Sequence, residues 1–375
     1  MLELSGGRFR AVYRIAAPGE EEAAAVAAEI AIEQTIEYPA DLVSREDIRG
    51  QIFGRVESIA RGGDDFFDAT ISYADETAGG DLPQLLNVLY GNSSLKPGIR
   101  LERLDLSEGV LSRFRGPRFG RAGLRALLGV PGRPLLATAL KPMGLSPQEL
   151  ACLAYQLALG GIDLVKDDHG LADQPFCRFE DRVHLAAEAV ARANRETGLG
   201  TIYAPNVTAP VGELARRARF ACEAGAGALL ISPGLAGLDA MRALADDDRI
   251  ALPLLFHPAL LGSFVTCPED GISPFALFGQ IARLAGADAS IFPHYGGRFS
   301  FSAEHCLSIA RGTEEAMGGL VPIFPVPAGG MTLSRVPELV RFYGRDVVLL
   351  IGGALHRGRD LVETCRRFRG LVEAG

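Results

Sequence analysis

Four ionisable side chains follow one another at the end of a short apolar run: Lys166, Asp167, Asp168 and His169 close the segment GGIDLVKDDH at 160–169. A buried lysine can act as a base, or it can react with CO₂ to form a carbamate that supplies an oxygen ligand to a metal. A carbamate beside Asp168 would give hard oxygen ligands suited to Mg²⁺. Because side chains alternate along a strand, Asp167 is expected to point the other way and to cap or pack. A merely solvated strand end is the alternative.

Eight apolar runs of this kind recur along the chain, at 134–140, 162–166, 201–207, 227–232, 253–258, 289–293, 321–328 and 347–353. Amphipathic segments with helical spacing lie between them, for example at 147–159, 182–197, 211–224 and 337–343. This alternation predicts a (β/α)₈ TIM barrel. A doubly wound open sheet is the competing architecture, but no G-x-G-x-x-G segment follows the first run.

The first 110 residues have a different pattern. Strand-like and helical segments follow in the order β-α-β-β-α-β, at 9–16, 20–33, 51–59, 66–73, 82–90 and 99–106. That order predicts a ferredoxin-like α+β domain. The basic, aperiodic segment 112–120 is the expected linker, so the predicted domains are residues 1–115 and residues 125–375.

Polar residues and glycine pairs follow most of the barrel strands. Since a barrel builds its active site at the C-terminal ends of its strands, the candidates there are Lys141, Lys166, Asp168, His169, Asn206, His257 and His294. Gly329-Gly330 and Gly352-Gly353 follow the seventh and eighth strands, where barrels commonly bind phosphate through backbone N–H groups. These pairs favour a phosphorylated small molecule, although glycines that only turn the chain are the alternative.

The composition describes an ordinary acidic protein. A net charge of -8 lacks the basic excess that nucleic-acid binding requires. The six cysteines form no C-x-x-C pair, which suits free thiols in a reducing compartment. The N-terminus does not resemble a signal peptide, and no apolar run reaches the length of a membrane span. We therefore expect a cytoplasmic protein without nucleic-acid or membrane partners.

Five segments together resemble a known family. ATALKPMGLSPQEL (137–150) and GGIDLVKDDH (160–169) are similar to two signatures of the large subunit of ribulose-bisphosphate carboxylase, RuBisCO. HPAL (257–260), PVPAGGM (325–331) and LLIGGALHRG (349–358) resemble three further blocks of that family. The order and spacing agree, and the resemblance extends over essentially the whole chain, including the ferredoxin-like domain.

The resemblance implies roles for individual residues. Lys141 would be the catalytic lysine near the substrate carbonyl, Lys166 the lysine that becomes carbamylated, and Asp168 a magnesium ligand. His257 would be an active-site histidine, and Gly330, Gly352 and Gly353 would contact phosphate. Asn92 would be the asparagine that enters a neighbouring subunit's site, which implies a homodimer with shared active sites.

Four departures from the carboxylase pattern are equally informative. Met143 and His169 stand where carboxylases have a second lysine and a glutamate ligand, and Pro258 replaces an arginine. The segment 294–301 lacks the lysine-bearing loop, whose lysine stabilises the carboxylated intermediate, so CO₂ fixation is not expected. Arg298 in that segment is expected to take over phosphate or carboxylate binding.

The chain thus resembles the RuBisCO-like proteins, or form IV, which keep the enolisation chemistry. The leading hypothesis is an isomerase or enolase that forms a metal-stabilised enediolate of a phosphorylated keto-sugar, such as a methylthio-sugar phosphate. Lys141, His169 or His257 would move protons, while Lys166 and Asp168, with His169 as a third candidate ligand, would hold Mg²⁺.

Four alternatives stay open. The enzyme could decarboxylate a 3-oxo sugar-acid phosphate, or the chain could be a non-catalytic sugar-phosphate-binding protein. The metal could also differ, because the imidazole of His169 prefers softer divalent metals such as Mn²⁺ or Zn²⁺. Finally, Lys166 could remain a free amine with no metal at all.

Overall fold

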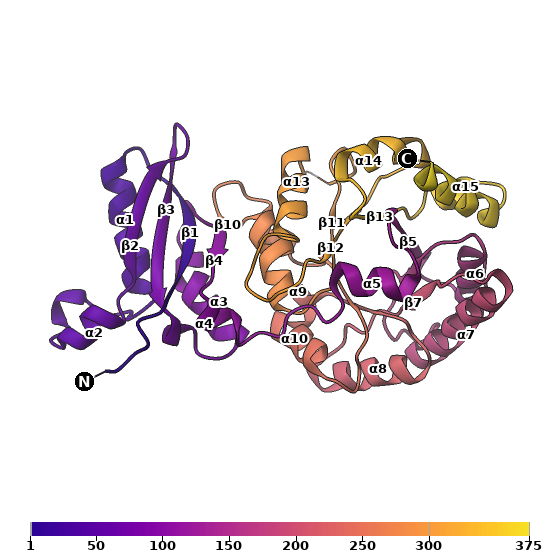
Figure 1. Ribbon diagram of the computed structural model, residues 1–375, viewed down its shortest axis with the longest axis horizontal. Helices are drawn as coiled ribbons and strands as arrows, with labels where there is room; N and C mark the ends of the chain where they lie inside the picture. The colour runs from indigo at the N-terminus through magenta and orange to yellow at the C-terminus, as the bar shows by residue number, and fades with distance from the viewer. Residues whose placement is uncertain (1, 300, 375) are drawn as a thin grey trace. The chain divides into compact units, whose positions relative to one another are not determined.

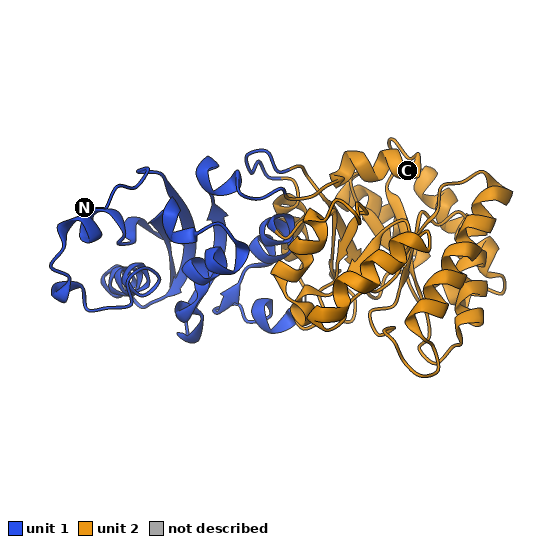
Figure 2. Cartoon of the chain, turned by 90° about the horizontal axis from the view of Figure 1, so that it is seen from below, with its two compact units in different colours: residues 1–115, 261–284, 315–320 blue, residues 116–260, 285–314, 321–375 orange. Residues whose placement is uncertain are grey.

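The chain forms two compact units in the computed structural model, which describes residues 2–299 and 301–374 (Figure 2). The first unit comprises residues 1–115, 261–284 and 315–320, and the second comprises residues 116–260, 285–314 and 321–375. The sequence did not predict the two later segments of the first unit. Within the described ranges, no helix has the length and apolar character needed to cross a membrane.

A five-stranded sheet with helices forms the first unit. The sheet order is β10-β4-β1-β3-β2, and the strands are β1 (Arg8–Ala16), β2 (Arg55–Arg61), β3 (Phe66–Ala74), β4 (Ile99–Asp105) and β10 (Gly271–Ile272). Its helices are α1 (Glu20–Glu33), α2 (Glu46–Gln51), α3 (Leu82–Tyr90), α4 (Glu108–Leu111), α11 (Gly262–Val265), η4 (Phe275–Ile281) and α12 (Ala282–Leu284). β1 to β4 with α1 and α3 confirm the predicted β-α-β-β-α-β order, to which β10 adds a parallel edge strand.

One predicted strand begins later than expected. The strand predicted at 51–59 starts at Arg55, and the residues before it belong to α2 and a turn. Gly54 lies so close to α1 that a Cβ atom there would stand 2.5 Å from the carbonyl oxygen of Ala31. The chain turns at Ile52 and bends at Phe53 before β2 begins, and both of these apolar residues are half-buried.

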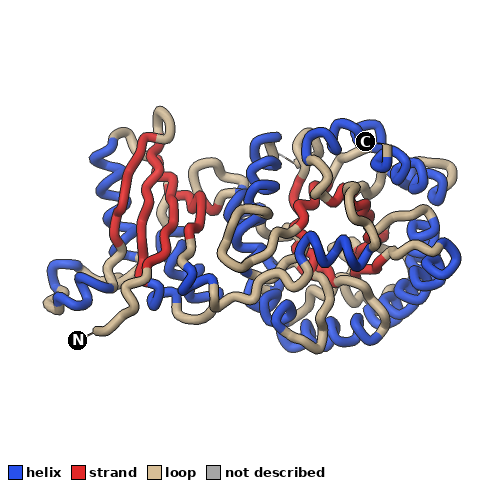
Figure 3. Tube along the Cα trace, in the orientation of Figure 1, coloured by secondary structure: helices blue, strands red, loops and turns tan. Residues whose placement is uncertain are grey.

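Eight parallel strands form the barrel of the second unit (Figure 3). They are β5 (Leu135–Leu140), β6 (Leu164–Asp167), β7 (Ile202–Ala204), β8 (Leu229–Ile231), β9 (Leu254–Phe256), β11 (Ala289–Pro293), β12 (Phe324–Ala328) and β13 (Val348–Leu350). Their order is β7-β6-β5-β13-β12-β11-β9-β8, and a bridge between Asn206 and Leu230 joins the two ends. The predicted barrel is confirmed, with one strand in each apolar run.

Helices surround this ring of strands (Figure 1). They are α6 (Pro147–Leu159), α7 (Phe179–Thr197), α8 (Val211–Glu223), α9 (Pro233–Ala236), α10 (Leu238–Asp246), α13 (Ala303–Gly312), α14 (Val336–Tyr343) and α15 (Leu361–Glu373). α6 begins where the sequence predicted, because Ser146 and Glu149 form a capping box and Pro147 occupies the first helical position. These local signals fix the register of the helix that follows Lys141.

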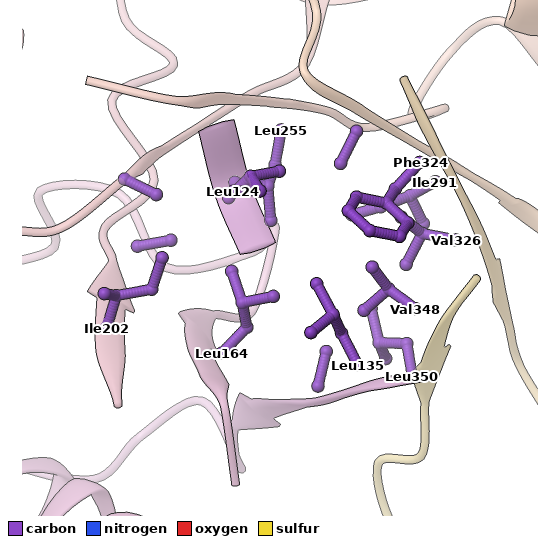
Figure 4. Packing of buried hydrophobic residues seen from close by; sticks show 14 of the residues in the cluster. Leu124, Leu135, Leu164, Ile202, Leu255, Ile291, Phe324, Val326, Val348 and Leu350 are labelled. Atoms are coloured by element: carbon purple, nitrogen blue, oxygen red, sulfur yellow. The ribbon is translucent and has the colours of Figure 1, made fainter. Parts of the chain in front are cut away.

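A further helix, α5 (Gly120–Leu128), covers the N-terminal ends of the barrel strands. Its Leu124 packs in one apolar cluster with inward residues of the strands, such as Leu135 and Leu164 (Figure 4). The buried carboxylate of Asp288 accepts backbone N–H groups of Phe119 and Gly120, both at 2.7 Å, and of Leu254 at 2.9 Å. The N-terminal end of the barrel is therefore filled, and the polar strand ends lie at the opposite end.

Candidate active site

Three ionisable side chains meet at the C-terminal ends of β5 and β6. One oxygen of Asp168, Oδ1, lies 3.4 Å from Nζ of Lys141 and 3.2 Å from Nδ1 of His169. Burial alone would raise the pKa of Asp168, but the hydrogen bond from His169 and the charges of Lys141 and Lys166 hold it well below its usual range. Since an ionised carboxylate only accepts, Nδ1 of His169 carries a proton, and in the neutral form of the ring the lone pair is on Nε2.

Lys166 is buried beneath this cluster. Its side chain is 3% exposed, and its amine donates to the backbone carbonyl of Asp167 at 3.0 Å. Burial lowers the pKa of Lys166 to about 8, against the opposing charge of Asp168 and with the help of Lys141. At pH 7, Lys166 is then neutral in roughly a tenth of the molecules. The neutral amine is the form that can take up a proton or react with CO₂.

His257, which follows β9, stacks on His169. The ring centroids lie 4.6 Å apart and the ring planes differ by 14°. The backbone N–H of Ala259 donates to Nδ1 of His257 at 3.2 Å, so the ring proton is on Nε2. Burial lowers the pKa of His257 to about 2, and the nearby charges of Lys166 and His169 act in the same direction. The stacked rings thus offer a lone pair on His169 and an N–H donor on His257.

Asp167 faces away from this cluster, as strand alternation predicted. Its carboxylate accepts hydrogen bonds from Nε–H of Arg182 at 3.0 Å, from the hydroxyl of Tyr203 at 2.7 Å and from the backbone N–H of Asn206 at 3.0 Å. Asp167 and Arg182 are both fully buried. This carboxylate therefore has every partner it needs within the barrel wall and serves the fold.

Asn206 supports the loop after β6. Its Nδ2 donates to the backbone carbonyls of His169 and Leu171, both at 2.9 Å, and its Oδ1 accepts the N–H of Thr208 at 3.2 Å. With its amide engaged by backbone, Asn206 holds His169 in place rather than facing a ligand. The sequence had marked it only as one more polar strand end.

The two glycine pairs occupy different surroundings. Gly329 and Gly330 have φ values of 91° and 76°, and a Cβ at Gly330 would lie 2.8 Å from Cα of Gly297. The turns after β11 and β12 thus pack backbone against backbone, which only glycine permits. Gly352, after β13, lies beside Lys141, whose Cε is 3.9 Å from the position of a Cβ there. Gly353 has open space on its Cβ side.

His294 and Arg298 lie in the loop after β11. His294 is fully buried, and its Nδ1 is 3.0 Å from the hydroxyl of Tyr343. The guanidinium of Arg298 lies over the ring of Phe299, 5.0 Å from its centroid. In the part of the chain that the structure describes, neither side chain makes a hydrogen bond, ion pair or ring contact with Lys141.

Asn92 belongs to the first unit. It opens the short helix η3 (Asn92–Leu95), and its Nδ2 donates to Oε1 of Glu33 at 2.9 Å. Its expected role lies in the active site of a partner chain, so its surroundings in one chain do not test that role.

Two neighbours of the site were assigned no catalytic role from the sequence. Burial lowers the pKa of His356, in η6 (Leu355–Arg357), and the charge of Lys141 acts in the same direction. Met143 is 50% exposed and approaches the loop after β6, since a Cβ at Gly170 would lie 2.7 Å from its Cε. The sequence signals for His356 were its place after the second glycine pair and within the segment LLIGGALHRG that resembles the family.

The residues present would hold a metal ion only with a contribution from Lys166. Among residues 2–299 and 301–374, no three His, Cys, Asp or Glu side chains are grouped so that they could hold a metal ion. Asp168 and His169 supply two donors, and a third has to come from Lys166. The lowered pKa of Lys166 provides the neutral amine that carbamate formation requires. The donor set therefore fits a divalent cation after carbamylation of Lys166.

Comparison with known proteins agrees with this fold and cluster. Residues 120–297 match the catalytic domain of the ribulose bisphosphate carboxylase large chain. The crystal structure of a Rubisco-like protein from Rhodopseudomonas palustris is 41% identical, with a TM-score of 0.87 over 98% of this chain and 97% of that chain. The chain belongs to the RuBisCO-like proteins of the RuBisCO large-chain family.

Two relatives with named activities are also similar over most of their length. The 5-methylthioribulose-1-phosphate isomerase of Rhodospirillum rubrum is 42% identical over 354 residues, which cover 94% of this chain and 92% of that protein. The 2,3-diketo-5-methylthiopentyl-1-phosphate enolase of Geobacillus thermodenitrificans is 36% identical over 339 residues, or 87% of this chain and 81% of that protein. These relatives are enzymes other than carboxylases, as the four departures in this sequence predicted.

Proposed function

We propose that this chain is an enolising isomerase of a phosphorylated keto-sugar, with 5-methylthioribulose 1-phosphate as its first candidate substrate. The observation that carries the proposal is the stacked pair of His169 and His257, which present a proton acceptor and a proton donor next to Lys141. Isomerisation through an enediol needs both functions, because one carbon loses a proton and another site gains one. No carbon dioxide is consumed.

Each side chain has a distinct task in this proposal. Nε2 of His169 removes the proton from the carbon beside the carbonyl, and Asp168 stabilises the imidazolium that results. Nε2–H of the neutral His257 ring donates a hydrogen bond to the substrate oxygen, and the proton taken up by His169 is returned to the carbon on the other side of the enediol. The ammonium of Lys141 faces the negative charge that develops on the carbonyl oxygen.

A divalent metal, Mg²⁺ in the first instance, would be held by carbamylated Lys166 and by Asp168. When bound, it would polarise the carbonyl and stabilise the enediolate oxygen. His169 could serve as a third ligand, but its Nε2 has one lone pair and cannot bind a metal and remove a proton at the same time. A softer metal would favour the ligand role, and Mg²⁺ would favour the proton-transfer role.

The phosphate end of the substrate is assigned to the turns that hold Gly329-Gly330 and Gly352-Gly353. The position of Gly352 beside Lys141 supports this assignment, since a phosphate there would set the carbonyl within reach of the lysine. His294 and Arg298 are then available to the far end of the substrate. Met143 adds an apolar wall near His169, which suits a methylthio group better than a carboxylate.

We also propose a cytoplasmic homodimer in which Asn92 completes the partner's active site. A mixing experiment tests this arrangement. Asn92→Ala and Lys166→Met chains should each be inactive alone. Co-refolded from a mixture, they should regain about a quarter of wild-type activity, because mixed dimers contain one intact site. If the mixture regained no activity, the shared site would be contradicted.

The function is tested with purified protein, Mg²⁺ and bicarbonate in D₂O, by proton and phosphorus NMR. 5-Methylthioribulose 1-phosphate should exchange one carbon-bound proton and give an isomeric sugar phosphate, whereas Lys166→Met and His169→Gln should do neither. Cys152→Ser, an exposed residue of α6, is the matched control. Release of CO₂ from a 3-oxo acid analogue would favour the decarboxylase instead. Tight binding without exchange would identify a non-catalytic protein.

A further inference from the structure

One ring nitrogen of His294 is hydrogen-bonded, and the other has no hydrogen-bond partner among the described residues. It follows β11, and its backbone N–H donates to the carbonyl of Ala328 at 2.8 Å, which fixes the start of the loop. Nδ1 lies 3.0 Å from the hydroxyl of Tyr343 on α14. Nε2 is buried and has no hydrogen-bond partner among the described residues. A buried polar atom of this kind is costly unless a partner arrives.

The hydroxyl of Tyr343 decides which nitrogen carries the ring proton. Burial and the adjacent Cys306 thiol raise the pKa of Tyr343, so this hydroxyl remains a donor at all physiological pH values. Its two possible acceptors are Nδ1 of His294 and the sulfur of Cys306, and an imidazole nitrogen is by far the stronger acceptor. Donation to Nδ1 leaves the single proton of the neutral ring on Nε2.

The neutral state of His294 has its own cause. Burial lowers the pKa of His294 to about 4, and the positive charge of Arg335 acts in the same direction. Arg335 is itself held by Glu338 at 2.8 Å, and Glu338 also accepts the hydroxyl of Tyr295 at 2.7 Å. The titratable groups that face His294 from the packed elements are Tyr295, Cys306, Arg335, Glu338 and Tyr343.

The ring of Tyr343 is held in place by packing. It lies edge-on to Phe342, with centroids 4.7 Å apart and planes at 83°, and edge-on to Phe292 at 6.4 Å. α13 and α14, which carry Cys306 and Tyr343, lie beside β11 and β12 (Figure 1). The hydroxyl therefore points at His294 from a rigid site, so the tautomer is set before any ligand binds.

We infer that Tyr343 is a positioning residue that holds His294 in the Nε2–H tautomer, ready to donate to a substrate oxygen. The substrate contact rests on the proposed function, whereas the tautomer does not. Because Nε2 is buried in the structure, a substrate oxygen can reach it only when the residues that cover it move. A tyrosine that merely packs beside His294 would leave the tautomer and the substrate affinity unchanged when its hydroxyl is removed.

The tautomer is tested without substrate, by NMR of the full-length protein labelled with ¹⁵N-histidine. His294→Gln assigns the signals by loss. In the wild type, Nε2 of His294 should show the shift of a protonated nitrogen and Nδ1 that of an unprotonated one, unchanged down to about pH 5. Tyr343→Phe should mix the two tautomers, whereas Tyr295→Phe, which removes a neighbouring hydroxyl, should not. An unprotonated Nε2, or an unchanged ring in Tyr343→Phe, would overturn the inference.

The substrate contact is tested by steady-state kinetics in a double-mutant cycle. Tyr343→Phe should raise KM by about three- to tenfold and change kcat less, as expected for one hydrogen bond. His294→Gln keeps an N–H donor near the Nε2 position that does not depend on Tyr343. In that background Tyr343→Phe should have no further effect.

Two results would separate the possible failures. The positioning role would be overturned if Tyr343→Phe had equal effects in the wild type and in His294→Gln. It would also be overturned if Tyr343→Phe lost the tautomer by NMR but left KM unchanged. If the wild type did not turn over 5-methylthioribulose 1-phosphate, the proposed function would fail, and the NMR experiment would still decide the tautomer.

Discussion

His169 and His257 lie face to face, with ring centroids 4.6 Å apart, although 88 positions separate them in the chain. Each ring has its protonation fixed by a different neighbour, Asp168 in one case and the backbone N–H of Ala259 in the other. The result is a pair of identical side chains with opposite hydrogen-bonding character at one edge of the barrel. Burial keeps His257 neutral, so the pair does not become a doubly charged repulsive contact.

The two histidines should therefore fail in different ways when replaced. His169→Gln removes the acceptor and should lower both turnover and solvent deuterium exchange at least 100-fold. His257→Leu removes the donor while sparing the base, so exchange should continue when turnover has fallen by a similar factor. The two rates are measured together by proton NMR in D₂O. Equal loss of exchange in both variants would contradict the division of roles.

The buried charge of Lys166 should lower the stability of the protein near neutral pH. The pKa of about 8 in the folded chain lies below the ordinary 10.5, so between these values the unfolded chain holds a proton that the folded chain has released. The contribution of Lys166 to the free energy of unfolding thus rises between pH 8 and pH 10.5, by up to roughly 3 kcal/mol. At pH 7 the buried charge is a cost. Lys166→Met should remove it and raise the free energy of unfolding by roughly 1–3 kcal/mol at pH 7, with loss of activity.

Urea unfolding of wild type and Lys166→Met at pH 7, 8, 9 and 10 measures this difference. CO₂-free buffer is required, because a carbamate would replace the titrating amine. The gap between the two proteins should shrink as the pH rises. A constant gap would show that Lys166 is not the group responsible.

Adjacent carboxylates should respond oppositely to the same substitution. Asp167→Asn leaves the buried guanidinium of Arg182 without its counter-charge and should cost about 3–5 kcal/mol of stability. Asp168→Asn breaks contacts that are partly exposed and should cost about 1 kcal/mol or less, yet it should abolish turnover. Urea midpoints and the exchange assay separate the two effects. A stable Asp167→Asn protein would contradict its assignment to the fold.

The positions of the chemical groups were predictable because strand ends in a barrel share one edge. Local apolar runs located each of the eight strands, and alternation along β6 separated Asp167 from Lys166 and Asp168. Amphipathic spacing predicted α6 with the bounds that the structure shows. The resemblance to RuBisCO then supplied the family, which the comparisons with known proteins confirmed.

What the sequence could not supply depends on contacts between distant loops. The stack of His169 on His257 follows from how Asn206 holds the carbonyl of His169, and no local pattern encodes that bond. Tyr343 lies in an ordinary amphipathic helix, so only the folded chain associates it with His294. Residues 261–284 likewise join the first unit through β10, a two-residue strand too short to leave a periodic signal.

The two glycine turns should differ in what a methyl group does to them. Gly330→Ala would place Cβ 2.8 Å from Cα of Gly297 at a positive φ, which backbone cannot readily relieve, and should cost about 1–3 kcal/mol of stability. Gly353→Ala meets open space and should leave stability within about 0.5 kcal/mol. If phosphate binds at the second turn, the same methyl group should nevertheless raise KM about tenfold by filling the anion's place, with little change in kcat. Thermal unfolding and steady-state kinetics on both variants measure these effects, and a Gly353→Ala enzyme with unaltered KM would remove the phosphate from that turn.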